Sequence, residues 1–192
     1  QRLPFIAWGM KVPGVAASVR GLYAVISYNR RVIIPSSGST TGVDCTPDFH
    51  TGYRLMFIAF ALLFFACAVL LFLLVGFGLP FTTCMAMLVP VYSALVLHGA
   101  IAHRVLGKST MEYAGHSAVT LILFALPTLV AVGISTLTEW PAITIAGAVL
   151  GFFLLLWQHY KRMLYLGRSR WWSAVWFLTL AAGIAVACIL RG

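Results

Sequence analysis

Few side chains in this sequence can carry chemistry, and most of those that can are histidines. The chain has five histidines and four acidic residues. His98, His103, Glu112, His116 and His159 lie inside long apolar stretches or at their borders. Imidazole and carboxylate groups ligate zinc, iron or manganese, paired histidines ligate haem, and chains of Glu and His relay protons in membranes. These five residues are therefore the candidate metal site.

The spacing of these residues favours a shared pocket. Glu112 and His116 lie four residues apart, so a helix would place them on one face. A turn at Gly107 would return that helix beside His98 and His103. A polar pocket on one side of the membrane is the expected result.

None of these histidines stands in a specific motif. The sequence has no HExxH and no repeated ExxH across two helices. The competing interpretation is that they lie in the wet headgroup zone and bond to backbone, lipid phosphate or one another. No P-loop, GxSxG elbow or paired-carboxylate motif is present either. We therefore expect no cofactor and no enzymatic activity.

Composition indicates that the bilayer is the solvent of this chain. Hydrophobic residues make up 61% of its 192 residues and charged residues only 9%, and the mean hydropathy is +0.98. Thirteen Lys and Arg stand against four acids, but they lie between apolar runs instead of on one basic face. Membrane lipids, and not nucleic acid, are the expected partners.

Apolar stretches divide the chain. A hydrocarbon core about 30 Å thick needs roughly 20 apolar residues per helix. Five stretches reach that length, near 55–78, 80–103, 114–136, 140–160 and 171–190. The predicted fold is an all-α integral membrane protein in which five transmembrane helices over 53–192 form a bundle. Residues 1–34 are predicted to form interfacial amphipathic helices, and 35–52 a flexible linker.

Basic residues set the orientation of these spans. All thirteen Lys and Arg except Arg191 fall on one side of the predicted membrane, and cytoplasmic loops retain Lys and Arg. The N-terminus is therefore predicted to be cytoplasmic and the C-terminus outside, with a bacterial inner membrane as the expected location.

A second candidate site is the basic loop before the last span. It combines cations with tryptophans, a pattern that favours anionic headgroups or an acidic partner. The candidate lipid- or partner-binding residues are Lys161, Arg162, Arg168, Arg170, Trp171 and Trp172.

Small residues and prolines mark the spans. Gly147 and Gly151 form a GxxxG motif, which lets helix backbones approach closely. It can close the bundle internally or face a partner protein; we favour internal packing. Pro90 and Pro127 each remove a backbone donor near the middle of a span. They either gate a cavity or are accommodated by neighbouring helices, which is the commoner case.

Three sequence features together resemble a known group. They are Pro90 with Ala94, the stretch from Leu106 through Glu112 to His116, and the run from Tyr160 to Arg170. The pattern resembles the Yip/Yif-type five-span proteins, and more closely an uncharacterised bacterial five-span family whose members often carry an N-terminal zinc ribbon. This chain lacks the ribbon cysteines and separates the Glu from the His. The resemblance implies a cytoplasmic N-terminus, a compact five-helix bundle and a scaffold-like role in membrane organisation.

Two functional hypotheses follow. The first is a non-enzymatic accessory or scaffold protein that binds lipid, a larger membrane complex or both. The second is a metal- or haem-binding redox or transport protein that uses the His/Glu cluster.

Overall fold

A computed structural model describes residues 14–34 and 49–189. Over these residues the secondary structure is helical, with no strand, and the all-α prediction is confirmed. The chain divides into two compact units, residues 1–57 and 58–192, and each is described separately. Residues 1–13 and most of the predicted linker, 35–48, lie outside the described residues.

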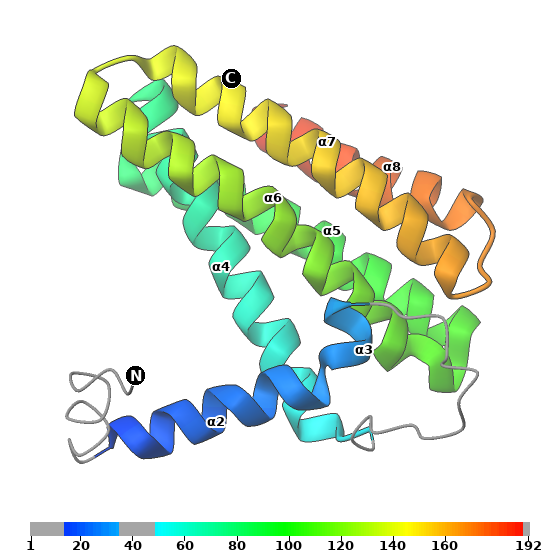
Figure 1. Ribbon diagram of the computed structural model, residues 1–192. Coiled ribbons are helices and arrows are strands. Elements are labelled where there is room, and N and C mark those ends of the chain that lie inside the picture. The colour runs from blue at the N-terminus through cyan, green and yellow to red at the C-terminus, as the bar shows by residue number, and fades with distance from the viewer. Residues whose placement is uncertain (1–13, 35–48, 190–192) are drawn as a thin grey trace. The chain divides into compact units, whose positions relative to one another are not determined.

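The second unit consists of long apolar helices (Figure 1). Four helical segments are long and apolar enough to cross a membrane, which supports an integral membrane protein: Thr51–Phe77, Phe81–Thr138, Pro141–Tyr165 and Trp171–Ile189. The second segment contains two helices that a short 3-10 turn, η1 (Gly107–Ser109), divides. The long helices are α4 (Thr51–Phe77), α5 (Phe81–Leu106), α6 (Thr110–Thr138), α7 (Pro141–Tyr165) and α8 (Trp171–Ile189).

Turn chemistry explains where these helices end. α5 ends at Gly107, whose φ of 54° lies in the left-handed region that glycine adopts without a Cβ clash. α6 ends at Glu139, which also has a left-handed conformation. Pro141 then occupies the first position of α7, where its missing N–H has no intrahelical partner to lose. Successive helices therefore run antiparallel (Figure 1).

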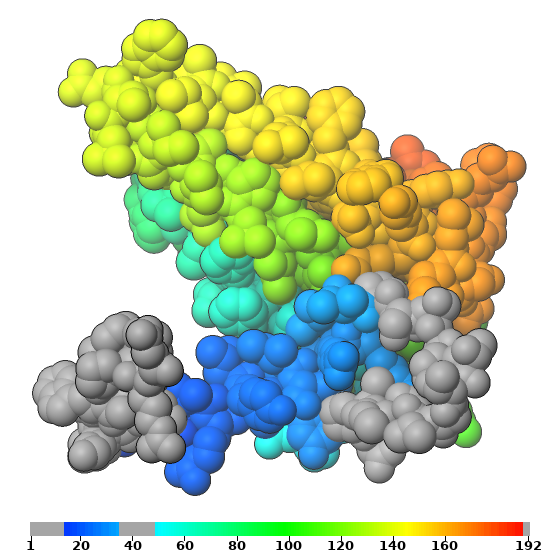
Figure 2. Space-filling model, in the orientation of Figure 1, coloured from blue at the N-terminus to red at the C-terminus, as the bar shows by residue number. Residues whose placement is uncertain are grey.

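Glycines bring the helices together in two antiparallel pairs, α6 with α7 and α5 with α8. A Cβ built on Gly147 would lie 2.1 Å from Cβ of Ala131 in α6, and one on Gly151 would lie 2.5 Å from the Phe124 carbonyl oxygen. Only glycine fits such contacts. The GxxxG motif therefore faces α6, which confirms the prediction of internal packing, and Figure 2 shows the α6 and α7 surfaces meeting without a gap.

Both prolines lie at close contacts within these pairs. α5 and α6 continue as helices through Pro90 and Pro127. A Cβ on Gly183 would lie 3.0 Å from the Pro90 carbonyl oxygen, and one on Gly147 would lie 2.8 Å from that of Pro127. Neighbouring backbone thus packs directly against both proline-containing segments.

Large side chains fill the centre between the pairs. The core cluster includes Phe65 of α4, Leu121 of α6, Leu155 of α7 and Leu180 of α8, all less than one-tenth exposed. α4 crosses α6 obliquely (Figure 1), and its Gly76 lies close enough to α7 that a Cβ would be 3.2 Å from Cγ2 of Thr144.

The first unit contains α2 (Val15–Tyr28), the short α3 (Arg30–Ile33) and the start of α4. Between α2 and α3, Nδ2 of the buried Asn29 donates to the Val25 carbonyl at 2.7 Å and to the Tyr53 carbonyl at 3.0 Å. The Tyr28 and Tyr53 rings stack at 4.7 Å, and the His50 ring packs against both. α2 has no buried residue, and its location at a membrane interface stays a prediction.

The glycine contacts give a direct test. Gly147→Ala should lower the free energy of unfolding by about 1–3 kcal/mol, because the added methyl group overlaps Ala131 and the helices must move apart. Unfolding of the full chain in mixed micelles at increasing dodecyl sulfate measures the change.

Gly133→Ala is the matched control, because a Cβ there meets nothing within 4 Å. It should leave stability unchanged or raise it slightly through helix propensity. Equal effects of the two variants would show that the α6–α7 contact does not limit stability.

Candidate functional site

Three buried histidines from three different helices gather near one end of the second unit, and each has its own side-chain partner. Two are less than 2% exposed and the third is 3% exposed. With their partners they form what we call the histidine cluster: His98, Tyr113, His116, His159, Arg162 and Ser173.

One interaction of the cluster lies within the α6–α7 pair. A guanidinium nitrogen of the buried Arg162 lies 3.1 Å from Nδ1 of His116. Because Arg can only donate, Nδ1 must accept, and a neutral imidazole therefore carries its proton on Nε2. The Tyr165 ring packs against the His116 ring at 5.5 Å. His116 thus provides an acceptor for a buried cation.

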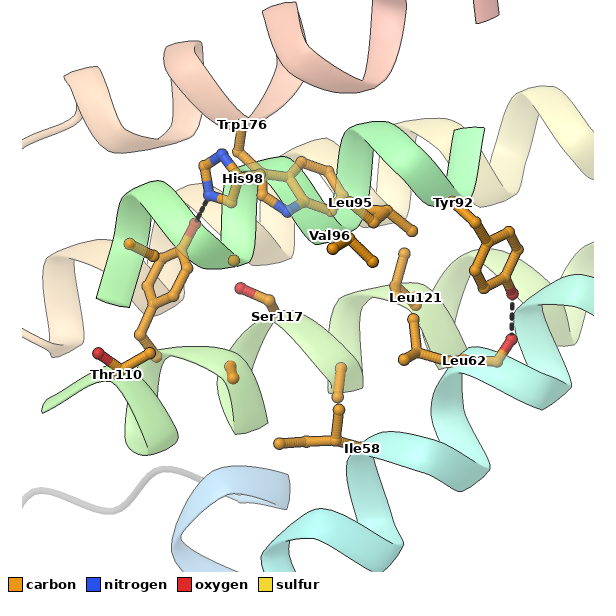
Figure 3. Close-up of a pocket in the computed structure, with 15 residues that line it drawn as sticks. Ile58, Leu62, Tyr92, Leu95, Val96, His98, Thr110, Ser117, Leu121 and Trp176 are labelled. Carbon is orange, nitrogen blue, oxygen red and sulfur yellow. Dashed lines mark hydrogen bonds between the residues drawn. The ribbon is translucent and has the colours of Figure 1, made fainter. Parts of the chain in front are cut away.

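Two further hydrogen bonds connect helices that belong to different pairs. Nε2 of His98 in α5 lies 2.5 Å from the Tyr113 hydroxyl in α6 (Figure 3). Nδ1 of His159 in α7 lies 3.0 Å from Oγ of Ser173 in α8. These bonds bridge α5 to α6 and α7 to α8, the neighbours that have few backbone contacts.

Aromatic rings enclose these histidines. The His159 ring stacks on Trp176 with centroids 4.6 Å apart and an interplanar angle of 20°. The Trp172 ring lies 5.8 Å from Tyr113 and 6.3 Å from His98. The histidines are therefore buried and closely packed, which makes each internal hydrogen bond costly to lose.

The structure brings together only part of the predicted metal site. His98, His116 and His159 are buried in the cluster, whereas His103 and Glu112 are exposed. Glu112 is four residues before His116, but it lies in the first turn of α6, where the side chain is exposed. Over residues 14–34 and 49–189, no three His, Cys, Asp or Glu side chains form a group that could hold a metal ion.

The basic loop is built on a Schellman motif at the end of α7. The Arg168 N–H donates to the Met163 carbonyl at 2.8 Å and the Gly167 N–H to the Leu164 carbonyl at 3.0 Å. Gly167 has the positive φ, 63°, that this motif requires. The turn into α8 is held by the Trp171 N–H, which donates to Oγ of Ser169 at 3.3 Å.

The six predicted lipid- or partner-binding residues separate into two groups. Arg162 is only 5% exposed and reaches inward to His116, and Trp172 packs against Tyr113. Arg162 therefore belongs to the histidine cluster, and Trp172 packs against it. The other four lie at the turn: Lys161, Arg170 and Trp171 are exposed and Arg168 is half-buried. We call these four residues the basic turn.

Lys161 also has an aromatic neighbour. Its ammonium lies 4.1 Å from the centroid of the Trp157 ring, a cation–π contact. Trp157 is 52% exposed and Trp171 is 74% exposed. Cations and amphipathic rings thus occupy one end of the α7–α8 hairpin, a composition typical of the membrane–water interface.

Sequence reasoning did not place Tyr113, Ser173 or Trp176 in the site. Tyr113 was expected at the interface as part of an aromatic belt, but it is 3% exposed and bonds His98. A signal was present for the other two: Ser173 and Trp176 are three residues apart and so share one face of α8.

Comparisons of this chain with protein-family models, with curated proteins and with solved structures found no match.

Arg162 is the residue through which the cluster can be tested. Arg162→Met should lower the free energy of unfolding by about 1–3 kcal/mol, because it removes the donor to Nδ1 of the buried His116. The double variant Arg162→Met/His116→Leu should lose less than the sum of the two single variants. Unfolding in mixed micelles of the four members of this cycle measures the coupling.

Lys161→Met is the control, since it removes a neighbouring exposed cation and should change stability little. Strict additivity of the two single variants would mean that the bond between Arg162 and His116 contributes nothing.

Proposed function

We propose that this chain is a non-enzymatic accessory or scaffold protein of a bacterial inner membrane that binds anionic phospholipid at its basic turn. The observation that carries the proposal is the gathering of four residues where α7 turns into α8: Lys161 near the end of α7, Arg168 and Arg170 on a turn held by backbone hydrogen bonds, and Trp171 at the start of α8. Cations at this depth attract anionic headgroups, while an exposed tryptophan ring partitions into the interface. The scaffold role agrees with what the resemblance to Yip/Yif-type proteins implies.

The small-residue helix faces pack within this chain, which favours lipid over a large protein partner. The glycines that could have admitted a partner helix, Gly147, Gly151 and Gly183, pack against α6 and α5 of this chain. The basic turn, in contrast, is exposed.

The proposal includes five crossings, one for each of α4 to α8. It is supported by the antiparallel order of these helices and by the Gly107 turn, which divides the segment Phe81–Thr138 in two. Lys108 and Arg104 near that turn, and the basic turn after α7, then lie on the same side. This side is assigned to the cytoplasm because basic residues gather there.

The metal- or haem-binding alternative has less support. His98, His116 and His159 each hydrogen-bond a different side chain, and over the described residues they do not join a group of three or more His, Cys, Asp or Glu side chains that could hold a metal ion. The two remaining predicted ligands, His103 and Glu112, are exposed.

The lipid proposal predicts a loss of headgroup selectivity. Arg168→Gln/Arg170→Gln should weaken the preference for phosphatidylglycerol over phosphatidylcholine by about 1 kcal/mol for each charge removed. Native mass spectrometry of the purified full chain, titrated with both lipids, measures the preference.

The control variant keeps the charge: Arg168→Lys/Arg170→Lys should retain most of the preference for phosphatidylglycerol. Added salt should reduce this preference in every protein variant that shows it. An unchanged preference in the glutamine variant would refute binding at the basic turn.

The topology is tested by labelling single cysteines in an otherwise cysteine-free chain. With a membrane-impermeant maleimide added from outside the inner membrane, Thr138→Cys should react, whereas Lys108→Cys and Ser169→Cys should react only after lysis. All three residues lie at or near exposed helix ends. Reaction of Lys108→Cys and Thr138→Cys from the same side would contradict separate crossings by α5 and α6.

A further inference from the structure

A lateral pocket of about 200 Å³ lies at the seam between α4, α5 and α6 (Figure 3). Ile58 and Leu62 of α4 form one wall of the pocket, and Leu121 of α6 lies near Leu62 (Figure 3). The indole of Trp176 from α8 and the side chain of Ser117 face the space from opposite sides (Figure 3). No residue of the basic turn lines the pocket, so the two sites are independent.

Hydrogen bonds fix both ends of this pocket. At one end the Tyr92 hydroxyl donates to the Leu62 carbonyl and ties α5 to α4. At the other end His98 and Tyr113 tie α5 to α6. The lining also includes Gly99, which has no side chain, and Ala118, whose methyl group is too small to fill the space. The pocket therefore exists because these two hydrogen bonds hold the seam open between helices that otherwise have few contacts.

The lining determines what the pocket can hold. It is overwhelmingly apolar, and it lies within helices that are long and apolar enough to cross a membrane. A cavity of ~150 Å³ with an apolar lining stays dry and binds a molecule such as benzene. A space of this kind that opens toward a bilayer suits hydrocarbon and not water.

Charge near one end identifies the class of lipid. Thr110 lines the pocket and lies two residues after Lys108. Arg104 lies in the last turn of α5, just before the turn that contains Lys108, and both cations are exposed. Glu112 is the one carboxylate on this part of the chain. Two cations against one carboxylate favour an anionic headgroup at the mouth of an apolar space.

We propose that this pocket binds one acyl chain of an anionic phospholipid, with the headgroup held near Arg104 and Lys108. From that end of the pocket the acyl chain passes beneath Trp176 toward Leu121. The pocket recognises the acyl chain by its shape, and Arg104 and Lys108 recognise the headgroup by its charge.

The test uses a photoreactive lipid. The purified full chain is reconstituted in phosphatidylcholine vesicles that contain phosphatidylglycerol with a diazirine in one acyl chain. After illumination, peptide mass spectrometry should find label on pocket residues of α5 and α6, such as Ala118 and Leu121. A phosphatidylcholine probe with the same chain should label these residues less.

Gly99→Leu should abolish labelling inside the pocket. A Cβ on Gly99 meets nothing within 4 Å, so the longer side chain enters the open space without displacing the backbone. Gly133→Leu is the matched control, because its Cβ also meets nothing and it does not line the pocket. Labelling in the control should equal that of the unaltered chain.

A second blocking variant guards against misfolding. Val96→Trp replaces a 71% exposed residue at the edge of the pocket and should also remove the label. Pocket labelling that persists in both blocked variants, or that is equal for the two probes, would overturn the proposal. Neither variant alters the basic turn, so headgroup selectivity measured there should be retained, and failure of one proposal is distinguishable from failure of the other.

Discussion

Close approach of helix backbones at glycine is the constraint on which the rest of this bundle depends. Lipid tails are as apolar as leucine, so helices in a bilayer associate through van der Waals packing and hydrogen bonds instead of the hydrophobic effect. Gly147 and Gly151 seat α7 against α6, and Gly183 seats α8 against α5. These contacts fix the register of each pair. In one pair, that register brings Arg162 to His116.

The histidine cluster then joins pairs that glycine packing leaves apart. His98 bonds Tyr113 across the α5–α6 seam, and His159 bonds Ser173 across the α7–α8 seam. Hydrogen bonds between polar side chains hold the helices together there, because such bonds are strengthened in a buried, low-dielectric environment. This role accounts for the burial of His98 and His159 in an apolar chain. It also explains the lateral pocket, since a seam held at its ends by hydrogen bonds need not be filled between them.

Much of this architecture could be predicted from the sequence, and the missing part has a physical cause. Each of the five predicted apolar stretches contains a helix, because length and hydropathy are local properties of the chain. The inward direction of Gly147 was also predictable from residue size. The exposure of Glu112 was not predictable. The i, i+4 rule places Glu112 and His116 on one face of a helix, but it does not show where the neighbouring helix that could cover this face ends. The partners of His159 and Arg162 depend on helix register, which no local pattern encodes.

The two proposed lipid contacts differ in the physics that would govern them. At the basic turn, Arg170 and its neighbours lie beside water, where a Coulomb interaction is screened by salt and tolerates many headgroup shapes. In the lateral pocket, the walls around Trp176 select by volume, and salt has no direct effect on a hydrocarbon chain. A protein with both contacts senses headgroup charge and chain shape independently. That combination would suit the proposed scaffold role, because either property alone is shared by most of the bilayer.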